Sequence, residues 1–118
     1  LLLQRHEALA GIACVEAAGG AGAATAVKEA GRVGKVKVVS MDRDNSVLKY
    51  IEQDVIQATV AQQTALMPIY AVAILHQLNH LTVPIATDNA AAKVSGVPNS
   101  VDTGVIIIDK ANAKYFMR

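Results

Sequence analysis

Four polar residues have the types and positions that a ligand rich in hydroxyl groups requires: Glu16, Asp42, Arg43 and Gln62. Ionised carboxylates accept hydrogen bonds in pairs, whereas an amide both donates and accepts them. The vicinal hydroxyls of a sugar need this mixture, and the charge-assisted bonds to Asp42 would be the strong ones. Arg43 could either neutralise the carboxylate or reach the ligand itself. We call these four residues the polar rim.

The elements around the polar rim predict that its members lie at one edge of a sheet. An apolar, β-branched run at Val36–Met41 ends at Asp42, and a second β-rich run at Ala58–Ala61 ends at Gln62. A helical pattern lies between the two runs, so residues 35–63 predict a βαβ unit. Ligands bind at the C-terminal strand ends of open parallel sheets. We therefore expect Asp42 and Gln62 to stand side by side.

The rest of the chain continues the alternation of strands and helices, and 118 residues suffice for one domain with one core. This alternation predicts an α/β fold, with a parallel sheet flanked by helices. A long irregular stretch precedes the last strand. Besides the two strands of the βαβ unit, strands are expected at 11–15 and 105–108, and a small-residue turn is expected at 17–22. Helices are expected at 23–30, 64–78 and 111–117, and another follows the cap residues 44–46. Residues 1–9 are expected to be the end of a helix.

A structural role remains open for part of the polar rim. Asp42 and Asp44 could both cap the helix that follows them, because short acidic side chains accept hydrogen bonds from the first N–H groups of a helix. Arg43 could be a solvated side chain. We assign Asp44 to the cap and keep both possibilities for Asp42.

A dinucleotide site is a second alternative. Gly20 and Gly22 follow the first expected strand, and Asp42 stands 20 positions beyond Gly22. Strand, glycine turn, helix, strand and acid form the outline of such a site. The fingerprint is imperfect, because Thr25 stands where a third Gly or Ala belongs and Glu16 would repel phosphate. The plainer explanation is a tight turn whose small residues let a helix pack closely on the sheet.

Other chemistry finds little support in the sequence. His76 and His80 have a zinc-binding spacing, but no third ligand or HExxH motif accompanies them. No nucleophilic triad is evident, so we expect no catalytic residues, no metal, no cofactor and no enzyme activity. Cys14 lies in an apolar pattern and is expected to be a small core residue. A net charge of +1 with 3% aromatic residues argues against a nucleic-acid partner.

The stretch GKVKVVSMDRDNSVLKYIEQDVIQATVAQQ, with AATAVKEAG before it, resembles the type I periplasmic sugar-binding proteins of ABC transporters, the ribose- and galactose-binding group. That family's pattern is a strand ending in Asp, a helix, a run like IDATVAQ, and a helix that begins the return to the other lobe. The segment VDTGVIIIDKANAKYF resembles the family's C-terminal strand and final helix. The resemblance implies that residues 1–118 are one lobe, the C-terminal half of a two-lobed fold, with a crossover helix at 64–80.

The resemblance also implies a function. Asp42 and Gln62 fall on positions that contact ligand in the family, whereas Glu16 stands where the family usually has Asn or Asp. Met41 stands where many members have an aromatic residue. The implied protein is a periplasmic protein or an extracellular lipoprotein that captures a monosaccharide between two lobes and delivers it to an ABC permease.

Two further expectations follow from this resemblance. The chain opens on LLLQRHEAL, which indicates a fragment, and the crossover helix would then lack its covering lobe. Exposed apolar surface on that helix would favour self-association. A second function shares the same fold, namely the effector-binding domain of a lac-repressor-type transcription regulator.

Overall fold

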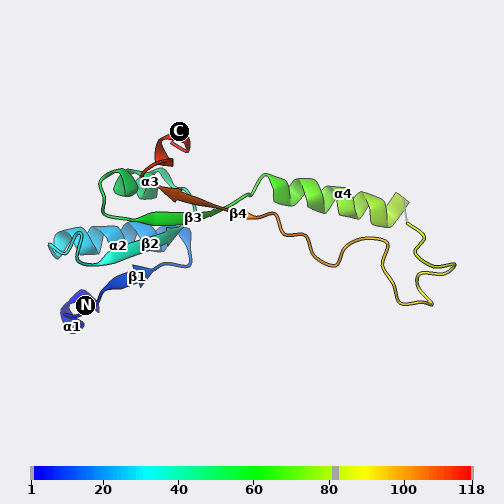
Figure 1. Cartoon of the computed structure of the whole chain (residues 1–118), viewed down its shortest axis with the longest axis horizontal. Helices are drawn as coiled ribbons and strands as arrows, with labels where there is room; N and C mark the ends of the chain where they lie inside the picture. Colours follow the sequence, from blue (N-terminus) through cyan, green and yellow to red (C-terminus); the bar gives the residue numbers. More distant parts are fainter. Residues whose placement is uncertain (1, 81–82, 118) are drawn as a thin grey trace. The chain divides into compact units, whose positions relative to one another are not determined.

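The computed structural model of the chain describes residues 2–80 and 83–117, which form two compact units. The first comprises the chain up to residue 62 and from residue 105 onward, and the second comprises residues 63–104. Figure 1 labels their α-helices and β-strands. The first unit contains α1 (Leu2–Arg5), β1 (Gly11–Ala13), α2 (Ala17–Glu29), β2 (Lys37–Met41), α3 (Asn45–Glu52), β3 (Ala58–Gln62), β4 (Val105–Asp109) and the 3₁₀ helix η1 (Ala113–Tyr115), and the second contains α4 (Leu66–His80).

Within the described residues, the sheet has four strands in the order β1-β2-β3-β4. The first three are parallel, as the sequence predicts, but β4 runs antiparallel to β3. The reason lies in the connection between them. The chain leaves the sheet after Gln62 and returns at Val105, and these two residues are register partners. Because the chain re-enters at the edge from which it left, β4 must run back along β3. The predicted fold class is otherwise confirmed.

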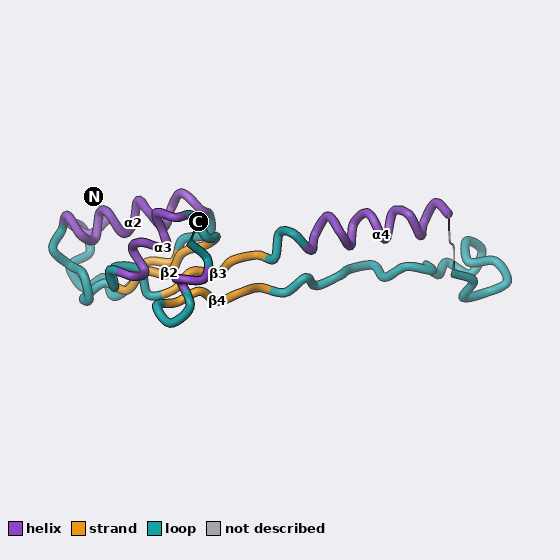
Figure 2. Tube along the Cα trace, turned by 90° about the horizontal axis from the view of Figure 1, so that it is seen from above, coloured by secondary structure: helices purple, strands orange, loops and turns teal. Residues whose placement is uncertain are grey.

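One face of the sheet is covered by α2 and α3 (Figure 2). Alternate residues of each strand point to this face, as the two-residue period of a strand requires. In β2 these are Val38 and Ser40, and in β3 they are Thr59 and Ala61. The helices supply small and branched side chains that fill the space above them. The buried apolar residues are Ala24, Val27, Val36, Val38, Val47, Leu48, Ile51, Val55, Ile56, Ala61, Ile108 and Ala113.

The opposite face of the sheet carries the other half of each strand and is open. Val39, Val105 and Ile107 belong to this face, and they are exposed to 40%, 61% and 54%. In an α/β fold both faces of a parallel sheet are normally covered by helices. Within the described residues, one face of the sheet is therefore covered by helices and the other exposes apolar side chains.

Helix α2 begins earlier than the sequence suggests. The expected turn at 17–22 is wrong, because helix runs continuously from Ala17. Its C-terminal end is as expected: Gly31 adopts φ +64°, the left-handed conformation that glycine takes at the end of a helix. The N–H of Gly31 bonds to Lys28 O and that of Arg32 to Val27 O, the pair of bonds of a Schellman motif. Glycine is thus a helix stop at residue 31 but not at residues 19–22.

The second unit contains α4 and the irregular segment 83–104. Pro68 lies in the first turn of α4, where a missing N–H costs little. None of the described side chains of α4 is buried within the chain. In the irregular segment, Asn89 accepts bonds from the N–H groups of Ile85 and Ala86 and donates to Val83 O. One amide side chain therefore organises the turn at 83–89.

Candidate functional site

Asp42 immediately follows β2, in a backbone conformation that few non-glycine residues adopt. Its φ is +65°, in the left-handed region that Asp and Asn tolerate better than most residues. Its N–H donates to Val60 O at 2.9 Å. Its carbonyl oxygen accepts a hydrogen bond of 2.6 Å from the hydroxyl of Thr59. Both bonds come from β3, so the backbone of Asp42 is fixed to the neighbouring strand on either side of its Cα atom.

Gln62 is the last residue of β3, and its side chain is exposed. Because β2 and β3 are parallel and Met41 is paired with Val60, the two strands end at the same edge of the sheet. Asp42 and Gln62 therefore stand at adjacent strand ends, as the sequence predicts. Their contact with a ligand remains a prediction.

Glu16 occupies the N-cap position of α2, just beyond the end of β1, and it is exposed. Since β1 is the parallel neighbour of β2, Glu16 follows the same edge of the sheet. Within the residues that the structure describes, the Glu16 carboxylate makes no capping hydrogen bond to α2. The edge thus carries two carboxylates and one amide, from three consecutive parallel strands.

Cys14 lies between β1 and Glu16 and is half-buried, less enclosed than the expected core residue. Its N–H bonds to Val39 O and extends the β1–β2 ladder by one residue. Burial raises the pKa of the Cys14 thiol, and the negative charge of Glu16 raises it further. Both effects disfavour the thiolate, which is the nucleophilic form. The geometry agrees with an unreactive thiol.

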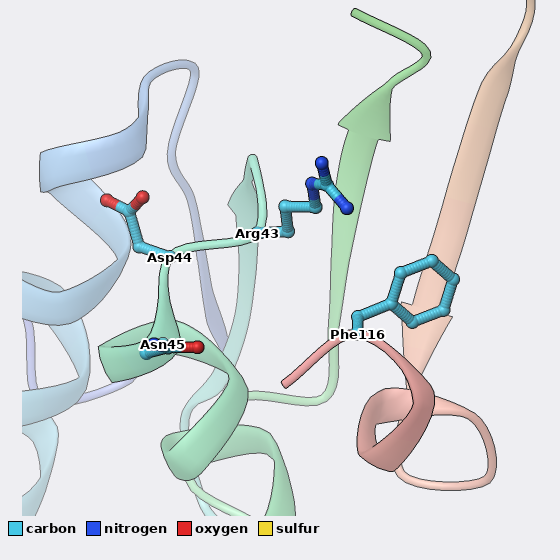
Figure 3. Close-up of a pocket in the computed structure, with 4 residues that line it drawn as sticks. All are labelled: Arg43, Asp44, Asn45 and Phe116. Carbon is cyan, nitrogen blue, oxygen red and sulfur yellow. The ribbon is translucent and has the colours of Figure 1, made fainter. Parts of the chain in front are cut away.

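Arg43 lines a shallow hollow of about 260 Å³ together with Asp44, Asn45 and Phe116. Figure 3 shows the side chains of Arg43 and Phe116 on one side of the 43–45 turn, with Asp44 extending to the other side. Arg43 is exposed. Its guanidinium is therefore free of burial costs and available to a carboxylate or a ligand hydroxyl, the two roles considered from the sequence.

The N-cap position of α3 belongs to Asp44 and not to Asp42. The carbonyl of Asp44 accepts the N–H of Leu48 at 3.0 Å, the first bond of the helix. The Asp44 side chain makes no capping hydrogen bond in the structure described for residues 44–52. Of the two acids considered for the cap, only Asp44 holds the position. Asp42 sits two residues earlier, held by β3.

The dinucleotide alternative loses its structural basis. The fingerprint requires a glycine-rich turn between strand and helix, and Gly20 and Gly22 both lie inside α2. Gly20 has a packing role instead: a Cβ atom built there would lie 1.8 Å from Ser40 Oγ. The explanation by close helix–sheet packing is therefore correct, although the segment is a helix and not a turn.

The histidines lie near the C-terminal end of α4. The rings of His76 and His80 are 4.8 Å apart between centroids, and both side chains are exposed. Among the residues that the structure describes, no group of three or more His, Cys, Asp or Glu side chains could hold a metal ion. A bilayer-spanning helix, which needs a long apolar segment, is likewise not found in that part of the chain.

Sequence reasoning missed Thr59 and Phe116. Thr59 is fully buried in the sheet, yet it has the hydroxyl that bonds to Asp42. A signal did exist, because Thr59 occupies an inward position of an apolar strand, where a hydroxyl needs a partner. Phe116 gave no comparable signal, because its place beside Arg43 depends on how the chain end folds back.

Comparisons with known proteins agree with this architecture. A family model described as a periplasmic binding protein domain matches residues 1–80. The chain therefore belongs to the periplasmic binding protein family, and the resemblance noted in the sequence is confirmed. Among curated protein sequences, no match to the chain is found.

Solved structures that resemble this chain include sugar-binding proteins of ABC transporters. A sugar ABC transporter sugar-binding protein from Bacillus halodurans is 34% identical with a TM-score of 0.81, over 98% of this chain and 39% of that one. An arabinose-binding protein from Geobacillus stearothermophilus is 32% identical with a TM-score of 0.81, over 99% and 39%. An ABC transporter solute-binding protein from Agrobacterium vitis, with bound D-fucose, is 25% identical with a TM-score of 0.71, over 99% and 38%. This chain thus spans about two fifths of the length of these relatives, which agrees with one lobe of a type I fold.

Proposed function

We propose that the chain is the C-terminal lobe of the solute-binding component of a sugar ABC transporter, and that it binds a monosaccharide at the polar rim. The observation that carries the proposal is the placement of Asp42 and Gln62 at the C-terminal ends of neighbouring parallel strands. Open α/β sheets bind ligands at such strand ends. Relatives 34% and 32% identical are described as a sugar-binding and an arabinose-binding protein, which supports a sugar as the ligand.

Each member of the polar rim has a role in this proposal. Asp42 accepts hydrogen bonds from sugar hydroxyls, and its charge makes those bonds strong. Gln62 donates to one hydroxyl and accepts from another. Glu16 adds a second acceptor, from the end of β1. Arg43 lies beside the site with its guanidinium exposed, where it balances the charge of Asp42 or reaches the sugar.

In the whole protein, residues 1–118 would form one lobe together with the crossover helix at 64–80, and a second lobe would close over the sugar. Closure of two lobes about a hinge is a common mechanism of ligand capture. The protein would hand the sugar to a permease without chemical change, with no cofactor and no metal. Members of this family work in the periplasm or outside the cell, and we propose the same location here.

Helix α4 has a part in the same proposal. Its apolar side chains include Ile69, Val72 and Leu75, which are exposed to 61%, 66% and 58% within this chain. We expect the second lobe to cover them in the whole protein. In the isolated chain they would favour self-association, since soluble proteins seldom leave a large apolar patch exposed.

The transporter function has better support than the two alternatives. The relatives above are described as transporter proteins, which favours transport over the effector domain of a regulator. The place of Gly20 and Gly22 inside a helix weighs against a nucleotide-binding domain.

A melting assay on the full-length protein tests the proposal. Arabinose and D-fucose are the first probes, because relatives are described with these sugars. Binding to the folded state raises the melting temperature by mass action. We expect a pentose or hexose to raise it and NAD to leave it unchanged. Protection by NAD and by no sugar would overturn the proposal.

A further inference from the structure

The left-handed conformation of Asp42 needs a physical cause. A non-glycine residue at φ +65° is disfavoured relative to the right-handed or extended conformations. The direction of the Cα–Cβ bond depends on the backbone angles, so a change of conformation at Asp42 would redirect its carboxylate. Something must therefore hold this residue where the isolated backbone would not stay.

Two neighbouring residues of β3 provide the restraint. Val60 accepts the N–H of Asp42 at 2.9 Å, which any residue at position 60 could do through its backbone. Thr59 donates its side-chain hydroxyl to the carbonyl oxygen of Asp42 at 2.6 Å, which only a hydroxyl-bearing residue at position 59 can do. The second bond is therefore the one that the sequence encodes in a side chain.

The burial of Thr59 indicates that its hydroxyl has a specific role. Thr59 is 0% exposed, on the sheet face covered by α2 and α3, and its register partners are the buried Ile108 on β4 and the buried Ser40 on β2. Valine has nearly the same shape as threonine and would fill this buried position without a polar group. Burying a hydroxyl is unfavourable unless it is hydrogen-bonded, and its partner here is the carbonyl of Asp42.

We infer that Thr59 is the positioning residue of the sugar site: its hydroxyl keeps Asp42 in the left-handed conformation that presents the carboxylate to the ligand. This inference rests on the proposed function, because it takes Asp42 to be a ligand-binding residue. When the binding-competent conformation is populated only in part, the apparent dissociation constant rises by the inverse of that fraction. Loss of the Thr59 hydroxyl weakens sugar binding although Thr59 itself does not touch the sugar.

Two substitutions at residue 59 separate positioning from packing. Thr59→Val keeps the shape and removes the hydroxyl, whereas Thr59→Ser keeps the hydroxyl and removes a methyl group. Ile108→Val is the matched control, because it removes one methylene from the register partner without touching Asp42. All are made in the full-length protein, with arabinose and D-fucose as the probes.

The three variants should differ from the wild type in different ways for sugar affinity and for stability against urea. Thr59→Val weakens sugar binding by roughly five- to tenfold, the range that the loss of one hydrogen bond produces in a conformational equilibrium. Thr59→Ser and Ile108→Val bind within about twofold of the wild type, although both lower the urea midpoint. A Thr59→Val protein that binds as tightly as the wild type, while Asp42→Ala binds more weakly, overturns the inference.

Hydrogen exchange at the amide of Asp42 gives a readout that is independent of the ligand. That amide is bonded to Val60 O, and it should exchange several-fold faster in Thr59→Val than in the wild type. The amide of Lys37, on the same strand but bonded to Ala10 O on the side of β1, serves as the internal reference. An unchanged rate at Asp42 overturns the inference even if no sugar binds, whereas failure of the wild type to bind any monosaccharide overturns the proposed function.

Discussion

Gly20 of α2 lies against Ser40 of β2 so closely that a Cβ atom on the glycine would come within 1.8 Å of Ser40 Oγ and 2.7 Å of Ser40 Cβ. Real Cβ atoms do not approach other atoms so closely, so any other residue at position 20 would displace the helix from the strand. Ser40 is two residues before Asp42. The approach of α2 thus fixes the end of the strand that carries the site.

We predict that Gly20→Ala destabilises the protein although alanine is the better helix former. Alanine gains about 1 kcal/mol over glycine within a helix, whereas overpacking a tight contact costs roughly 1–3 kcal/mol. The contact should prevail, with a net loss of up to about 2 kcal/mol in urea unfolding. Gly22→Ala is the matched control, since nothing lies within 4 Å of a Cβ there, and it should stabilise.

A double mutant tests the cause of that loss. Ser40→Gly removes both close atoms, leaving Val47 Cγ2 at 3.4 Å as the nearest neighbour of the new methyl group. Gly20→Ala should then cost less in the Ser40→Gly background than in the wild type, with a coupling of about 1 kcal/mol or more. Additive effects of the two substitutions would show that the contact with Ser40 is not the cause.

The reactivity of Cys14 provides a prediction on pH. Burial and the nearby charge of Glu16 both raise the pKa of the thiol, so less thiolate is present at a given pH than in an ordinary cysteine. Alkylation by iodoacetamide should rise with pH along a curve whose midpoint lies above that of a model cysteine, about 8.5. Glu16→Gln should shift this midpoint down by a smaller amount than the total, because burial is the larger cause. A midpoint below the model value would contradict the structure.

The exposed side chains of α4 predict how the isolated chain behaves. Val72 and Leu75 are three residues apart, so they lie on one side of the helix, and both are more than half exposed. Light scattering during size-exclusion chromatography should show a mass that rises with concentration. Val72→Lys with Leu75→Lys should reduce it, and Gln77→Lys on the same helix should not. A monomer at every concentration would count against association through α4.

Much of the fold could be predicted from local sequence patterns. The predictions that are wrong concern features that depend on residues far apart in the sequence. The β-branched run before Asp42 and the apolar face of Val47, Leu48 and Ile51 each specify one element and one buried side, and both predictions are confirmed. The direction of β4 depends on where the chain returns after the excursion at 63–104, which no short window contains.

The site shows the same division between local and non-local information. The placement of Asp42 and Gln62 at adjacent strand ends could be predicted because each stands at the end of an apolar run. The sequence predicts a turn at 17–22 because composition does not reveal that Gly20 faces Ser40. The bond between Thr59 and Asp42 depends on the register of β2 and β3, which brings together residues 17 apart in sequence. Neither the contact of Gly20 with Ser40 nor the bond between Thr59 and Asp42 can be predicted from local propensity.

Titration calorimetry on the full-length protein tests the central claim most directly, with Asp42→Ala compared against Asp44→Ala. Both changes remove one carboxylate, but Asp44 holds the N-cap position of α3 and points away from Arg43 and Phe116 (Figure 3). We predict that Asp42→Ala loses about 2 kcal/mol or more of sugar-binding free energy, as expected for removal of a charged hydrogen-bond partner. Asp44→Ala should bind nearly as the wild type does. Sugar binding unchanged by Asp42→Ala would contradict the account.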